Sequence, residues 1–427
     1  IVIGGSTLLD TLKPDSDIDI IIIVSKSCLI VNALFCSQCR KIYSQLGKFC
    51  NLHDYIFGNN KKSLYTMFRN ELVNFYFIVN LENLISDNSS QLIKIENARI
   101  PLFSILIYGV DIDVMVAPVP YENIPIELNL SNYENRRIIL NNLELINELI
   151  NRMNLLNDFQ YTKSILMLNG YRIAYREKFF LIDSKIRNKF TNLLRAIKLW
   201  ANQREIYSNI FGYLSGTILS IMATKICLIY PNSNLPFLLQ QFFLIFSTWK
   251  WPIPLFTEDF KEDFEEISEP KLVKSWNLSD LNQTEYFKGD QMPIISSPLP
   301  YQNTAFNINK FTKQKIIEQM TYAFNQFSNN SIKPFSSDNF WKNNLFAKFD
   351  YKNYYNYFLI IICSVKENNN NNLNEQCGLI KTKIRLNLLN WVNKTIIYLN
   401  NEEIKLNKYL DNYHVISGYQ EKIKCSE

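Results

Sequence analysis

Four aspartates, arranged as two pairs, are the residues of this chain most suited to chemistry. Asp17-Ile18-Asp19 begins a run of isoleucines, and Asp111-Ile112-Asp113 lies inside a second apolar stretch. Alternate side chains of a strand share a face, so the two aspartates of each pair point the same way. Carboxylates beside an apolar core are costly unless a cation compensates them. Oxygen-only ligands without histidine fit Mg²⁺, and two such ions can activate a hydroxyl nucleophile and neutralise a leaving pyrophosphate. Taken alone, each pair is more simply explained as a solvated strand end.

A turn of small residues precedes the first pair. Gly4-Gly5-Ser6 follows three apolar residues and comes shortly before Asp17. Backbone N–H groups and a serine hydroxyl at such a turn can bind a phosphate. Gly-Gly-Ser carries little information by itself. Followed by Asp-x-Asp and a later strand aspartate, it is typical of the nucleotidyltransferase fold of the DNA polymerase β type.

The elements that must position these residues follow from the hydrophobic pattern. The β-branched run at 18–24 predicts a buried central strand, and residues 102–108 and 110–116 predict two more. Residues 29–46 have helical periodicity. Together these segments predict a mixed sheet with flanking helices over residues 1–125. Because the chain starts with Ile inside an apparent strand, we expect this first domain to lack its N-terminus.

Two further regions follow the predicted sheet. Residues 126–310 are predicted to be mainly helical, with helices at 134–153, 191–204, 212–230 and 235–249. Residues 311–427 begin with a predicted helix at 314–327 and continue as a strand at 354–364, a helix at 380–389 and a strand at 394–399. The whole chain is therefore expected to be an α+β multidomain protein.

The composition excludes some classes of enzyme and indicates the cellular compartment. Only two histidines, His53 and His414, occur in 427 residues, which nearly excludes multi-histidine zinc hydrolases and Ser-His-Asp systems. Eight cysteines without regular pairing indicate reduced thiols in an intracellular protein. Cys36-x-x-Cys39 and Cys50-x-x-His53 resemble a zinc pattern, but the gap between the pairs is short, and buried thiols are the preferred interpretation. No apolar stretch reaches the length of a membrane span.

The net charge of +5 lies in the C-terminal region. Residues 311–427 hold 15 Lys and Arg against 10 Asp and Glu, whereas residues 1–310 are balanced. Within the balanced part, residues 172–198 hold eight basic and two acidic residues. Such a locally basic segment suits a polyanion such as a triphosphate or an RNA backbone, and a solvated helix face is the alternative.

Longer stretches resemble one family, the eukaryotic poly(A) polymerases that carry a C-terminal RNA-binding domain. Leu168-Asn169-Gly170-Tyr171-Arg172 resembles the family's Leu-Asn-Gly-x-Arg motif, and residues 195–216, RAIKLWANQREIYSNIFGYLSG, resemble its most recognisable block. Other similar blocks lie in the same order at 96–113, 242–254, 292–308 and 377–385. The last block lies in the C-terminal domain, which the noncanonical poly(A) and poly(U) polymerases lack.

The resemblance implies a fold and an activity. The expected domains are a polymerase β-like nucleotidyltransferase mixed sheet at 1–125, a helical middle domain at 126–310 and an RRM-like α/β RNA-binding domain at 311–427. The implied activity is template-independent addition of AMP from ATP to RNA 3′ ends, in nuclear mRNA polyadenylation. The expected cofactor is Mg²⁺, for which Mn²⁺ can substitute. The expected protein is a monomer that binds the RNA 3′ end and pre-mRNA 3′-end processing factors, but no membrane.

The resemblance also assigns roles to individual residues. It implies that Asp17, Asp19 and Asp113 form the catalytic, metal-binding triad. Nucleotide-binding residues follow from the other motifs: Gly5, Ser6 and Lys198 for the triphosphate, Tyr207 for the nucleotide, Asn169 for the sugar or base, and Gly216 with Thr217 for the adenine.

The chain departs from the family at several places near the expected site. Thr7-Leu8-Leu9-Asp10 replaces Tyr-Arg-Leu-Gly, and Ala174-Tyr175-Arg176-Glu177 replaces Thr-Asp-Glu-Ile. Ser215 stands where the family has the first glycine of a pair, and an insertion falls within about residues 51–91. These departures bear on nucleotide contacts. They leave two alternatives open, an inactive relative that acts as an RNA-binding scaffold and a terminal uridylyltransferase.

Overall fold

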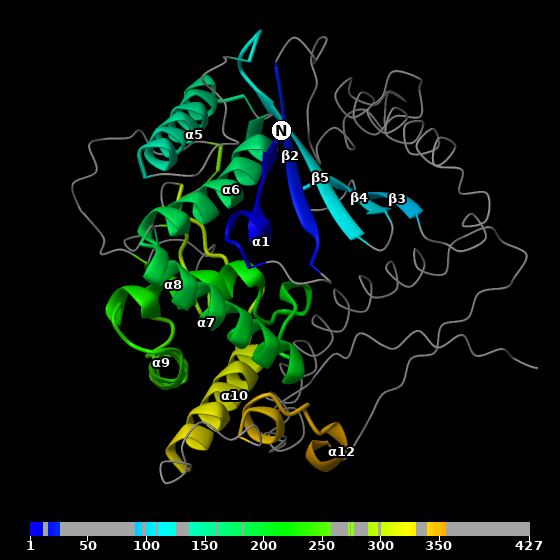
Figure 1. Ribbon diagram of the computed structural model, residues 1–427. Helices are drawn as coiled ribbons and strands as arrows, with labels where there is room; N and C mark the ends of the chain where they lie inside the picture. The colour runs from blue at the N-terminus through cyan, green and yellow to red at the C-terminus, as the bar shows by residue number, and fades with distance from the viewer. Residues whose placement is uncertain are drawn as a thin grey trace, which may run out of the picture.

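The computed structural model describes residues 1–11, 16–25, 90–95, 100–107, 110–124, 136–158, 161–181, 183–257, 272–273, 275–276, 289–297, 300–329 and 340–355. In this part of the chain, a mixed sheet lies beside a group of helices (Figure 1). The predicted helix at 29–46, the Cys36, Cys39, Cys50 and His53 set and most of the predicted insertion lie outside these residues. The predicted RRM-like domain lies mostly outside them too, and so stays a prediction.

The sheet brings the two aspartate pairs onto neighbouring strands. Its five strands are β1 (Val2–Ile3), β2 (Ile18–Ser25), β3 (Ser90–Ile95), β4 (Leu102–Ile107) and β5 (Val110–Val119), in the order β1-β2-β5-β4-β3. β2 and β5 are parallel, and the other neighbours are antiparallel. The register places Asp19 directly opposite Asp113. The predicted mixed sheet is therefore confirmed, and the parallel pair explains how residues 94 positions apart meet.

Helices surround one face of the sheet and extend away from it. They are α1 (Gly5–Leu8), α5 (Arg136–Leu156), α6 (Thr162–Phe180), α7 (Ser184–Gln203), α8 (Gly216–Ile229), α9 (Leu235–Thr248), α10 (Lys310–Asn329) and α12 (Tyr351–Tyr354). Side-chain caps mark where four of them begin, because Asp183, Ser215, Asn234 and Asp350 each accept a hydrogen bond from a backbone N–H in the first turn.

Two predicted helix starts are corrected by these caps. The helix predicted from residue 212 begins at Gly216, because Gly212 has φ +79° and ends a short 3₁₀ turn, and Ser215 then caps α8. The helix predicted from residue 191 begins already at Ser184. Here the cap Asp183 starts the helix seven residues earlier than the apolar pattern indicated.

Helix α6 links the sheet to the other helices, although the sequence pattern did not single it out. It packs against β5 and α1 on one side and against α5 and α8 on others (Figure 1). Its buried residues accordingly lie all around the helix, from Ile165 and Met167 to Tyr175 and Lys178. A helix buried on all sides has no apolar stripe, and so it shows no helical period in its hydrophobicity.

One cluster of buried apolar side chains joins the sheet to the helices, and its members range from Val2 to Leu345. Aromatic residues fill its centre, where Trp200 of α7 meets Phe243 of α9 edge to face, with ring centroids 4.8 Å apart. Helix α10 packs against α9, so it adjoins the helices of the predicted middle domain. The boundaries at 125/126 and 310/311 stay predictions. None of the helices in the described ranges combines the length and the apolar character needed to span a membrane.

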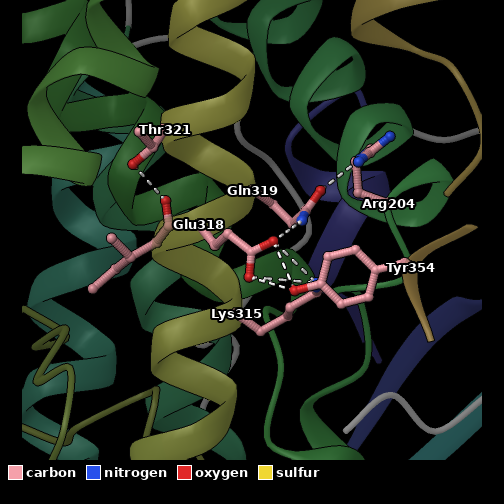
Figure 2. A network of polar contacts seen from close by, with 7 residues as sticks. Arg204, Lys315, Glu318, Gln319, Thr321 and Tyr354 are labelled. Atoms are coloured by element: carbon pink, nitrogen blue, oxygen red, sulfur yellow. Dashed lines mark hydrogen bonds and ion pairs between the residues drawn. The ribbon is translucent and has the colours of Figure 1, made fainter. Parts of the chain in front are cut away.

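A polar network on α10 contacts both the end of α7 and the segment after α10 (Figure 2). Arg204 Nε donates to Gln319 Oε1 over 2.7 Å. The fully buried Lys315 Nζ lies 3.2 Å from Glu318 Oε1 and 3.4 Å from the centre of the Tyr354 ring, whose hydroxyl donates to Glu318. Tyr354 lies in the short helix α12 rather than at the start of the strand predicted for 354–364. The ammonium group of Lys315 over the Tyr354 ring stabilises the packing of α12 against α10.

Candidate active site

The residues singled out by the sequence meet around one cavity of about 520 Å³. It lies between α1, the start of β2, and helices α6, α7 and α8. Eight of the ten predicted site residues line it: Gly5, Ser6, Asp17, Asp19, Lys198, Tyr207, Gly216 and Thr217. Segments separated by about 200 residues therefore form one site, as the colinear motifs predicted.

The turn at Gly5 is fitted to the Asp19 side chain. Gly4 N donates to the Asp19 carbonyl oxygen over 2.9 Å, which ties the turn to β2. Gly5 has φ +55°, and a Cβ atom built there would collide with Asp19 Oδ2. Only glycine combines this backbone conformation with so close an approach. The small residue predicted to face a phosphate thus also leaves room for one of the predicted metal ligands.

Burial and mutual repulsion raise the pKa values of two of the carboxylates. Burial raises the pKa of Asp19 to about 6, with further increases from Asp17 and Asp113 and a partial offset from Lys198. Burial likewise raises the pKa of Asp113, although a hydrogen bond from Ser104 opposes the rise. A bound cation would relieve the repulsion that raises both values.

These carboxylates fit a hard divalent cation by donor type and by charge. Their side chains do not converge into a coordination shell, since no three His, Cys, Asp or Glu side chains within the described residues form a group that could hold a metal ion. Asp17 and Asp19 line the cavity, whereas Asp113, opposite Asp19 on β5, is not among the described lining residues. The site thus has the ligand types for Mg²⁺, with two of the three predicted ligands at the cavity wall.

A lysine and a tyrosine face the carboxylates across the cavity. A Cβ atom on Gly216 would lie 3.6 Å from Lys198 Nζ and 3.2 Å from Tyr207 Oη, so the glycine lets both side chains approach the start of α8. Burial raises the pKa of Tyr207, and the charge of Asp17 adds to this. An ammonium group opposite carboxylates can bind a phosphate chain at one side while a metal ion binds it at the other.

The structure does not bring Asn169 to the cavity wall. Its side chain is buried, and Oδ1 accepts a 2.5 Å hydrogen bond from Arg172 Nη2. Arg172 is itself buried and also donates to Asn147 Oδ1 over 2.8 Å. A buried guanidinium needs acceptors, and Asn169 serves as one. Its expected contact with the sugar or base stays a prediction, as do the roles of Asp113 and the other motif residues.

Several lining residues were not among the predicted ones. Glu177 and Ser220 meet at the cavity wall, and the remaining lining residues are Leu9, Ser16, Gly170, Ile173, Ala174, Leu194 and Asn202. Glu177 lies in a stretch where the sequence departs from the motif, which was the one available signal. Its burial could not be foreseen, because α6 carries no apolar stripe.

Comparison with known proteins points to the same family that the sequence motifs resemble. Residues 189–347 match a model of the poly(A) polymerase central domain. The poly(A) polymerase of Dictyostelium discoideum is 30% identical over 297 residues, which are 69% of this chain and 32% of that protein. The poly(A) polymerase PAPa of Candida albicans is 24% identical over 298 residues, 69% of this chain and 46% of that protein.

The chain thus spans less than half the length of these two relatives. Among solved structures, the Cid1 poly(U) polymerase is 13% identical with a TM-score of 0.38, over 82% of this chain and 85% of that one. The domain match and the two sequence relatives together support one family. The chain belongs to the poly(A) polymerase family of nucleotidyltransferases.

Proposed function

We propose that the protein is a template-independent polynucleotide adenylyltransferase, which transfers AMP from ATP to the 3′ end of RNA. One observation carries this proposal. The cavity joins the Gly-Ser turn and Asp17 and Asp19 to Lys198, Tyr207 and Gly216, which lie in the part matched by the poly(A) polymerase central domain. A nucleoside triphosphate needs both a metal-binding carboxylate set and a cationic partner for its phosphates, and both face this space.

Each side of the cavity has a separate task in this proposal. The Lys198 ammonium group binds the triphosphate as a point charge, and Tyr207 presents an aromatic ring with a polar end to the nucleotide. Gly216 and Thr217, at the start of α8, lie against the base. Asp17, Asp19 and Asp113 would hold Mg²⁺, or Mn²⁺ in its place, which when bound neutralises the phosphates and the leaving pyrophosphate.

The transfer itself requires a proton acceptor near the attacking hydroxyl. In the proposed step, the RNA 3′-oxygen forms a bond to the α-phosphorus of ATP. The bond from that phosphorus to the bridging oxygen breaks, and pyrophosphate leaves. Asp113, opposite Asp19 on the neighbouring strand, accepts the hydroxyl proton.

The remaining expectations belong to the same proposal. The excess of 15 basic over 10 acidic residues in 311–427 supports RNA binding there. A monomer acting in the nucleus with pre-mRNA 3′-end processing factors is expected from the family resemblance alone.

Primer extension tests the proposal directly. The purified protein is incubated with an oligoadenylate primer, Mg²⁺ and each of the four ribonucleoside triphosphates separately, and products are resolved on a gel. Extension with ATP well above the others is expected. Preferred extension with UTP would assign terminal uridylyl transfer instead. RNA binding without any extension would assign the scaffold role.

A further inference from the structure

The carboxyl group of Glu177 is a buried feature of the cavity that the proposed mechanism does not use. Only 3% of this residue is exposed, and it lines the cavity. On α6 it continues the stripe formed by Gly170, Ile173 and Ala174, which are the other α6 residues at the cavity wall. In the family motif that this stretch resembles, isoleucine stands at the corresponding position.

The two oxygens of this carboxyl group have different surroundings. Ser220 Oγ of α8 lies within hydrogen-bond distance of Oε1, at 3.0 Å, and also 3.0 Å from the carbonyl oxygen of Thr217. Oε2 is buried and makes no hydrogen bond to any described residue. Buried polar atoms in native proteins almost always have a partner, and the cavity that Glu177 lines is where a bound molecule can supply one. Because Ser220 already pairs with Oε1, Oε2 is the oxygen of this group that lacks a partner among the described residues.

The charges around Glu177 determine which form of the carboxyl group is present. On α7, Lys198 is close enough to act on it electrostatically, whereas α8 contributes only the hydroxyl of Ser220. On α6 itself, the next residue, Lys178, is engaged with Leu8 O and Asp10 near α1. Burial raises the pKa of Glu177 to about 8, against the lowering effects of Ser220 and Lys198. Near pH 7 the group therefore keeps its proton and is a hydrogen-bond donor.

We propose that Glu177 is a further substrate-contacting residue, whose Oε2–H donates a hydrogen bond to an acceptor atom of the nucleotide bound in the cavity. This inference rests on the proposed function, since it takes the ligand to be a nucleoside triphosphate. A neutral acid can sit beside a triphosphate without repelling it. It also leaves the charge of Lys198 available for the phosphates, which an ionised Glu177 would compete for.

Two substitutions of nearly equal volume test the hydrogen-bond donor of Glu177 separately from the size of its side chain. Glu177→Gln keeps an acceptor for Ser220 and an N–H donor toward the cavity, whereas Glu177→Met removes both. The Kd for ATP is measured by calorimetry with the purified protein, and folding is checked by thermal unfolding. Glu177→Gln should bind within about twofold of wild type, and Glu177→Met about tenfold more weakly, as for the loss of one hydrogen bond.

Glu148→Gln, on the exposed face of α5, is the matched control and should bind as wild type. The inference is overturned if folded Glu177→Met binds ATP as well as wild type does, or if Glu177→Gln is as weak as Glu177→Met. Repeating the measurement with UTP locates the acceptor: an equal loss for both nucleotides places it on the sugar or phosphates, and an unequal loss on the base. If wild type binds no nucleoside triphosphate, the proposed function fails together with this inference. If wild type binds ATP, only the behaviour of Glu177 is in question.

A pH series keeps the inference testable even if Glu177→Met does not fold. Above about pH 8 the wild-type carboxyl group loses its proton, so it can no longer donate and adds a negative charge beside the phosphates. ATP binding by wild type should weaken between pH 7 and 9 relative to Glu177→Gln, whose amide does not titrate. Parallel pH profiles for the two proteins would contradict the proposed contact.

Discussion

Replacing Gly5 by alanine tests how closely the first turn is fitted to the Asp19 carboxylate. Gly5 has φ +55°, a conformation that costs a residue with a Cβ atom about 1–2 kcal/mol. The new methyl group would also overlap Asp19 Oδ2, and that carboxylate would have to rotate away from its place at the cavity. We therefore expect two separate effects, a loss of about 1–2 kcal/mol in stability and a displaced Asp19 carboxylate.

The second effect should dominate the activity. A misplaced catalytic group commonly reduces turnover by about 100-fold, so kcat/KM for ATP should fall by about that factor in primer extension. Gly4→Ala is the matched control. Gly4 has φ −111°, and a Cβ atom there would meet only Asp19 Cβ at 3.7 Å and Tyr171 Cδ2 at 3.8 Å, which are ordinary contacts. That variant should lose less than about 1 kcal/mol of stability and keep its activity within a few fold.

Urea unfolding and primer extension are measured on both variants at a temperature where both stay folded. If Gly5→Ala retains wild-type kcat/KM, the Asp19 carboxylate is not held by the turn as described. If Gly4→Ala is equally inactive, the effect comes from the turn in general rather than from the approach of Gly5 to Asp19.

Two further predictions concern the lysines. Lys198→Met should raise the KM for ATP by about 10- to 150-fold, the range expected when a charge-assisted contact of about 1.5–3 kcal/mol is lost; an unchanged KM in steady-state kinetics would exclude Lys198 as the phosphate ligand. Burial lowers the pKa of Lys315 from 10.5 to about 8. Between these values the unfolded chain binds more protons than the folded one, so this group makes the free energy of unfolding rise with pH. Lys315→Met should remove that rise between pH 8 and 10 in urea unfolding, and an unchanged slope would argue against a titrating Lys315.

The sheet and its aspartates were predictable from sequence because each depends on a local pattern. The β-branched run of β2 and the apolar run of β5 predict strands directly, and Asp-x-Asp in a strand predicts which side chains share a face. That Asp19 and Asp113 lie side by side followed only from the family motif. The intervening residues give no local signal for a parallel pairing over so long a separation.

What the sequence did not predict depends on tertiary packing. Helix α6 was not identified because it is buried on several sides and has no apolar stripe. For the same reason Asn169, expected at the nucleotide, was not foreseen as the acceptor for the buried Arg172. Glu177 was noted only as part of a departure from a motif. Its burial beside Ser220 emerges only when α6 is placed against α8.

The most direct test of the central claim is primer extension with the aspartates replaced one at a time by asparagine, which keeps volume but removes charge. Asp17→Asn, Asp19→Asn and Asp113→Asn should each stay folded, because Asp17 is exposed and the substitutions at Asp19 and Asp113 relieve the burial of a repelled charge. Each should lose at least about 1000-fold in ATP-dependent extension at saturating Mg²⁺. Asp111→Asn, on the same strand but more exposed, should remain active. Extension by Asp113→Asn at the wild-type rate would contradict the assignment of these carboxylates as the catalytic centre.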